Sequence, residues 1–108
     1  MRVYVAGAYS ADNVIDVLNN IRRGIAYCAQ LMKQGHSPFC PWLDWQFQMF
    51  EELTVQDYYR YSMDWLKVSE EVHVLPNSEH SRGTQKEIMQ ALELGIPVKH
   101  LIEQGRMG

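Results

Sequence analysis

Apolar and polar positions follow two alternating periods along the chain. Four short apolar runs, typical of buried parallel strands, predict strands over residues 2–6, 37–40, 72–75 and 98–102. Between these runs the apolar residues recur at helical spacing, which predicts helices from Val14 to a stop at Gly35 and over about 54–69 and 84–94. This alternation predicts an α/β fold: a small doubly wound parallel sheet, Rossmann-like or flavodoxin-like, of four to five strands with helices on both faces.

Residues 42–51 interrupt the alternation with an aromatic segment. Trp42, Trp45, Phe47 and Phe50 stand among polar side chains, which makes the segment too aromatic for a simple solvated loop. The rings either complete the core, pack against another subunit, or form a wall on which a base stacks, and the segment is also a candidate lid.

Length and composition narrow the class of protein. The 108 residues, 46% hydrophobic and 21% charged, fit one globular domain spanning 1–108 and contain no apolar run long enough for a membrane span. A net charge of −3 argues against a polynucleotide partner but not against a single nucleotide. Cys28 and Cys40 form no C-x-x-C pair, which favours two buried thiols and a cytoplasmic location.

The histidines give no sign of a metal site. His36, His73, His80 and His100 lack the spacing of zinc ligands, and we expect neither a metal nor a cofactor. His80 is either a solvated loop residue or a donor beside the loop that follows the third strand.

That loop carries the most informative chemistry of the chain. It runs from the strand at 72–75 through Ser81 and Gly83 to Glu87, at the carboxyl edge of the predicted sheet, where open α/β folds bind small ligands. Thr84-x-x-Glu87 has the spacing of a capping box, which gives Glu87 a structural alternative. The loop amides at a helix N-terminus favour an anion such as phosphate.

Several motifs together resemble a known family. They are Tyr4-Val5-Ala6-Gly7, Asp64-Trp65-Leu66, Glu71-Val72-His73-Val74, Ser81-x-Gly83-x-x-x-Glu87 and Ala91-Leu92-Glu93-Leu94-Gly95-Ile96-Pro97-Val98. With them the chain resembles the nucleoside 2-deoxyribosyltransferase-like superfamily, and within it the 2'-deoxynucleoside 5'-phosphate N-hydrolases and their short phage and bacterial relatives.

The resemblance implies roles for the residues of the 81–87 loop. Glu87 matches the nucleophile that attacks the anomeric carbon of deoxyribose, and Ser81, with Gly83, matches the part that binds the 5'-phosphate. The transferases acting on unphosphorylated nucleosides carry aspartate where this chain has Ser81. Asp64 is the candidate second acidic group, which orients the substrate and assists proton transfer, unless it is a solvated charge on its helix.

Strand one and the loop after it supply the remaining candidates. Tyr4 and Gly7 match the family's strand-one tyrosine and glycine; the glycine would let backbone approach the ligand, and Tyr4 is alternatively a core ring. Tyr9 and Ser10 are assigned to the pocket wall by position.

The predicted function is hydrolysis of the N-glycosidic bond of a deoxynucleoside 5'-monophosphate through a covalent glycosyl-enzyme intermediate. The alternatives are base exchange by a deoxyribosyltransferase, a non-catalytic nucleotide-binding module and an oligomeric scaffold. The aromatic content predicts a homodimer or higher homo-oligomer. Residues 104–108 do not match the C-terminal segment by which members of the family complete a neighbouring subunit's site.

Overall fold

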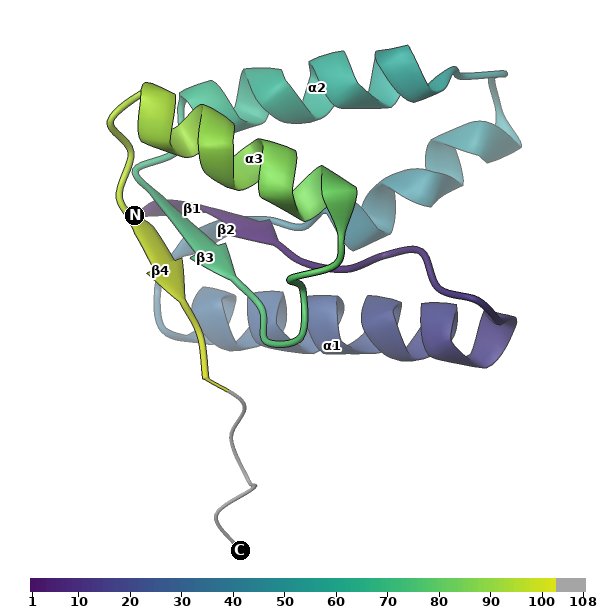
Figure 1. Ribbon diagram of the computed structural model, residues 1–108, viewed down its shortest axis with the longest axis horizontal. Helices are drawn as coiled ribbons and strands as arrows, with labels where there is room; N and C mark the ends of the chain where they lie inside the picture. Colours follow the sequence, from purple (N-terminus) through teal and green to yellow (C-terminus); the bar gives the residue numbers. More distant parts are fainter. Residues whose placement is uncertain (103–108) are drawn as a thin grey trace, which may run out of the picture.

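The computed structural model describes residues 1–102 and shows a four-stranded parallel sheet between two layers of helices (Figure 1). The elements in chain order are β1 (Arg2–Ala6), α1 (Val14–Lys33), β2 (Ser37–Phe39), the 3₁₀ helix η1 (Pro41–Met49), α2 (Val55–Lys67), β3 (Glu71–Val74), α3 (Arg82–Glu93) and β4 (Val98–His100). The predicted α/β class and doubly wound parallel sheet are confirmed. Residues 104–108 lie outside the described part, and the single domain over 1–108 stays a prediction.

The sheet has the strand order β2-β1-β3-β4, and every pairing is parallel. Helix α1 covers one face, while α2 and α3 cover the other (Figure 1). Residues 3–6 of β1 are therefore buried whichever face they point to. This explains why the strand is a continuous apolar run rather than an alternating one.

Local signals account for the ends of the helices. Asn13 caps α1 by accepting from the Asp16 amide at 2.9 Å, and Gly35 adopts φ +93° just after the helix ends. Thr54 and Asp57 form a capping box at the start of α2.

The strand ends differ from the prediction by one or two residues. β3 begins one residue earlier, and β4 ends two residues earlier. Pro38 lies within β2, which an edge strand tolerates because one side of its backbone is unpaired.

The aromatic segment divides into one core ring and several exposed rings. Trp42 is 1% exposed, so the core interpretation is confirmed for this ring. Trp45, Phe47 and Phe50 are 45%, 49% and 84% exposed. Their predicted role in a subunit contact stays a prediction.

None of the helices in residues 1–102 combines the length and apolar character needed to cross a membrane.

Candidate active site

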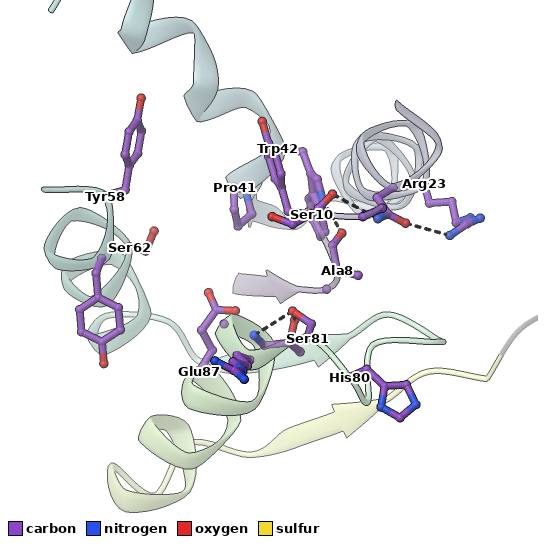
Figure 2. A pocket seen from close by; sticks show the side chains of 18 of the residues that line it. Ala8, Ser10, Arg23, Pro41, Trp42, Tyr58, Ser62, His80, Ser81 and Glu87 are labelled. Atoms are coloured by element: carbon purple, nitrogen blue, oxygen red, sulfur yellow. Dashed lines mark hydrogen bonds between the residues drawn. The ribbon is translucent and has the colours of Figure 1, made fainter. Parts of the chain in front are cut away.

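A cavity of about 940 Å³ opens where the carboxyl ends of β1 and β3 meet, a volume in the range of ligand sites (Figure 2). Its wall comes from the loop after β1, from α1, from the start of η1, from α2, and from the loop that leads into α3. Six of the predicted site residues line this one cavity: Gly7, Tyr9, Ser10, Ser81, Gly83 and Glu87.

Glu87 is held in the cavity wall by a tyrosine from the centre of the sheet. The hydroxyl of Tyr4 donates a hydrogen bond to Glu87 Oε2. Tyr4 itself is 0% exposed and does not line the cavity. This burial agrees with the alternative that Tyr4 is a core ring, whose hydroxyl reaches Glu87 from behind, and contact of Tyr4 with a substrate stays a prediction.

The environment of Glu87 favours the protonated form more than water does. Burial raises the pKa of Glu87 to about 7, the Tyr4 hydrogen bond opposes this shift, and the charge of Asp44 adds to it. Asp44 is half-buried in η1, and desolvation raises its own pKa to about 6. A carboxyl group with these properties in a cavity is a candidate for chemistry.

Helix α3 begins at Arg82, two residues earlier than predicted, and this corrects the capping-box interpretation of Glu87. Ser81 is the N-cap: its Oγ accepts from the Thr84 amide at 3.3 Å and from Thr84 Oγ1 at 2.9 Å. Glu87 therefore lies one turn too far along the helix to cap it, and its carboxyl group is left to Tyr4 and the cavity.

The first turn of α3 provides a polar end to the cavity. Since Ser81 Oγ accepts both of its hydrogen bonds, its own O–H can still donate. The amides of Arg82 and Gly83 occupy the first helical positions, which have no partner within the helix. A Cβ built on Gly83 meets nothing within 4 Å, so this side of the helix is open.

Trp42 and Ser78 hold the loop after β1 in place. Trp42 Nε1 donates to the Ala8 carbonyl at 3.1 Å, and Ser78 Oγ accepts from the Ala8 amide at 3.2 Å. A Cβ on Gly7 would lie 2.9 Å from Cζ2 of Trp42 and 3.1 Å from Leu75. Gly7 lines the cavity, and packing against these two side chains by itself requires a glycine there. Approach of a ligand to its backbone stays a prediction.

Asp64 is not brought to the cavity. It is exposed on α2, where its carboxylate lies 3.5 Å from the Arg60 guanidinium in an i,i+4 pair. This position agrees with the alternative of a solvated charge, and the expected role of Asp64 in orienting a substrate stays a prediction. The acidic residue whose charge reaches Glu87 is Asp44 instead.

Comparison with family models places the chain in a family. Residues 1–101 match the model described as Domain of unknown function (DUF7768). The chain belongs to this family. No curated protein matches the DUF7768 chain in sequence.

One similar solved structure is a 2-deoxyribosyltransferase from the psychrotolerant bacterium Bacillus psychrosaccharolyticus. It shares 16% sequence identity, with a TM-score of 0.66, over 95% of the DUF7768 chain and 77% of the other chain. This likeness shows that the two proteins share a fold, and it agrees with the superfamily resemblance of the sequence.

Two helices add cavity residues that the sequence analysis did not select. Asn20 and Arg23 come from α1, and Tyr58 and Ser62 come from α2. These pairs are spaced i,i+3 and i,i+4, so each lies on one helix face. Polar residues repeated at that spacing were the available signal, although the sequence alone does not show which face meets the loops.

His80 also lines the DUF7768 cavity, but its ring lies at the edge and points away from Glu87 (Figure 2). Within residues 1–102 no group of three or more His, Cys, Asp or Glu side chains is placed to hold a metal ion.

Proposed function

We propose that the DUF7768 chain hydrolyses the N-glycosidic bond of a deoxynucleoside 5'-monophosphate, with Glu87 as the nucleophile. The observation that carries this proposal is the placement of Glu87 in the wall of a nucleotide-sized cavity, held from behind by Tyr4. The shared fold with a 2-deoxyribosyltransferase gives independent support.

In the proposed reaction, the ionised carboxylate of Glu87 attacks the anomeric carbon as the bond from that carbon to the base breaks. The base leaves with the bonding electron pair and takes a proton. The resulting glycosyl ester is then hydrolysed by water, which releases the sugar phosphate and regenerates the carboxylate. Tyr4 positions the carboxyl group of Glu87, and burial, more than the charge of Asp44, sets how readily this group ionises.

The polar end of the cavity supports a phosphorylated substrate. The Ser81 hydroxyl and the amides of Arg82 and Gly83 are donors at the positive end of α3, where phosphate groups are favoured. A phosphate held there would fix the position of the sugar relative to Glu87 one turn further along the same helix.

Release of free base from a deoxynucleoside 5'-monophosphate tests the proposal. The wild-type chain should release base, and the unphosphorylated deoxynucleoside should react more slowly. Glu87→Gln should reduce release at least about 10³-fold because it removes the nucleophile. Glu93→Gln, an exposed change at the end of the same helix, is the matched control and should retain activity. Full activity of Glu87→Gln would overturn the assignment.

Base exchange is the second candidate, because the structural neighbour is named a deoxyribosyltransferase. Adding a foreign free base to the same reaction separates the two activities. A new nucleotide shows transfer to the base, whereas sugar phosphate alone shows transfer to water. Nucleotide binding with no base release over long incubation would instead favour a binding module.

A further inference from the structure

A second cavity, of about 780 Å³, lies against the opposite side of the sheet from Glu87. It is bounded by α1, by the loop at 75–78 that follows β3, and by residues 99–102 at the end of β4. Of the α-helices in residues 1–102, only α1 lies on this face (Figure 1). Within the same residues, the edge strand β4 is therefore only partly covered there.

The wall of this cavity carries positive charge without negative charge. Arg23 and Lys99 line it, and no Asp or Glu of the described residues does. Neither Arg23 nor Lys99 is within 4.0 Å of a carboxylate of residues 1–102. In a chain of net charge −3, such a wall is a local site of positive potential that favours an anion.

A hydrogen-bonded row of three side chains reaches this cavity from the core. Glu71 Oε1 lies 2.8 Å from Nε2 of His73, and Nδ1 of His73 lies 2.7 Å from the Tyr27 hydroxyl. His73 is only 5% exposed, so both of its ring nitrogens are fixed by these partners. Tyr27 lines the cavity, and the row fixes the position of its hydroxyl there.

The sheet register places a cation beside this row. His73 of β3 is paired with Lys99 of β4, and paired residues of neighbouring parallel strands point to the same face. Because His73 contacts Tyr27 of α1, Lys99 also belongs to the α1 face. The Glu71 carboxylate accepts from His73 Nε2, so Nδ1 of His73 accepts the Tyr27 proton, and this proton stays inside the row. The cations in this wall are therefore the groups available to an anion.

We propose that this second cavity binds a small dianion of the phosphate class through the charges of Lys99 and Arg23. The site is distinct from the Glu87 site, and the proposal does not depend on the proposed function. The two cavities nevertheless share Ala8, Asn20, Arg23 and Asn77 in their walls. A dianion in the second cavity would therefore compete with a substrate in the Glu87 cavity for the Arg23 guanidinium.

Titration with inorganic phosphate at constant ionic strength tests this proposal. We expect saturable binding by calorimetry, with the largest amide NMR shifts at residues 75–78 and 99–102. Lys99→Ala should weaken binding about tenfold by removing one charge-assisted contact. Lys67→Ala, a surface lysine at the end of α2 that lines neither cavity, should leave binding unchanged.

Glu87→Gln should also bind phosphate normally in this cavity, which separates the result from the fate of the proposed function. Lys99 is exposed, so its replacement should not prevent folding. Shifts confined to residues 81–84, an equal effect of Lys99→Ala and Lys67→Ala, or no saturable binding would each overturn the proposal.

Discussion

The surroundings of Glu87 shift the pKa of its carboxyl group in two opposite directions. Burial and the Asp44 charge raise its pKa, whereas the hydrogen bond from Tyr4 lowers it, and the result is a pKa of about 7. The proposed attack needs the ionised form. Base release should therefore rise with pH through about 7 and level off above it, provided that no other group limits the rate.

Substitutions of Tyr4 and Asp44 should shift the rising part of this pH profile, its acid limb, in opposite directions. Tyr4→Phe removes the hydrogen bond that favours the carboxylate, so the limb should shift to higher pH. Asp44→Asn removes a repelling charge, so the limb should shift to lower pH. The measurement is the pH profile of kcat/KM for base release. Shifts of the same sign in both variants would contradict this account of the site.

The raised pKa of Glu87 also has a consequence for stability. The folded chain holds this proton more tightly than the unfolded chain, so the free energy of unfolding should fall as pH rises from about 4.5, the ordinary value, to about 7. Glu87→Gln has no ionisable group at this position, so it does not lose this part of the free energy of unfolding. At pH 8 it should be more stable than the wild type by about 1 to 3 kcal/mol, and near pH 4 the two should be similar.

Urea unfolding of both proteins at pH 4 and pH 8 measures this difference. Part of the pH dependence should remain in Glu87→Gln, because desolvation raises the pKa of Asp44 as well. A variant less stable than the wild type at pH 8 would show that the carboxylate has a structural role instead.

At the scale of residues, the sequence indicates the cavity carboxyl Glu87 better than the residues that contact it. Glu87 and Ser81 were selected from a local motif, and both line the cavity. The contact between Tyr4 and Glu87 joins residues 83 positions apart, so only the parallel pairing of β1 with β3 brings them together. The sequence does not distinguish Asp44 from Asp64, because the two acidic residues differ in exposure, and exposure is seen only in the folded chain.

Helix α3 is the element on which the proposed phosphate site depends, and two glycines test it. Gly83 faces open space at the start of the helix, whereas a Cβ on Gly24 of α1 would lie 2.1 Å from the buried ring of Trp42. Gly83→Ala should leave stability unchanged or raise it by about 0.5–1 kcal/mol, because alanine is the better helix former. Gly24→Ala should destabilise by about 1–3 kcal/mol or more through overpacking.

Thermal unfolding and KM for the nucleotide together check these expectations. Gly83→Ala should raise KM, because the added methyl group occupies the space beside the amides where the phosphate is proposed to lie. A loss of stability in Gly83→Ala, or an unchanged KM, would contradict this view of the helix start.

Regular elements were predictable because their signals are local. The apolar period and Gly35 marked α1, and the alternation of strands and helices gave the doubly wound sheet. The 3₁₀ helix at Pro41–Met49 was not predicted, because the position of its rings depends on Trp42 packing against Gly24, a contact made only in the folded chain. Helix α3 begins at Arg82, two residues earlier than predicted, because Ser81 and not Thr84 caps it. Thr84 and Glu87 therefore form no capping box.

On the scale of the whole molecule, the sheet order 2-1-3-4 collects the loops after β1 and β3 at one edge, where both helix layers contribute to the cavity. The molecule also exposes rings that a monomer leaves in water. Three of these exposed rings lie on one segment: Trp45 and Phe47 in η1, and Phe50 directly after it. Trp65 of α2 is 48% exposed as well. Patches of this kind mark interfaces.

We therefore expect the chain to form a homodimer or higher homo-oligomer. Sedimentation velocity should show a species larger than the monomer, and Phe50→Asp, which places a charge on the most exposed ring of the segment, should shift the distribution towards the monomer. Val14→Asp, at a similarly exposed position on α1, is the control. A strictly monomeric wild-type chain would contradict the expectation.

We propose above all that the Glu87 carboxyl forms a covalent bond to the sugar during base release. The most direct measurement is peptide mass analysis of the enzyme quenched with acid during turnover of a deoxynucleoside 5'-monophosphate. We expect the peptide that contains Glu87 to gain the mass of a deoxyribose phosphate group. The same peptide of Glu87→Gln should show no such gain. Base release with the adduct on another residue, or undiminished release by Glu87→Gln, would contradict it.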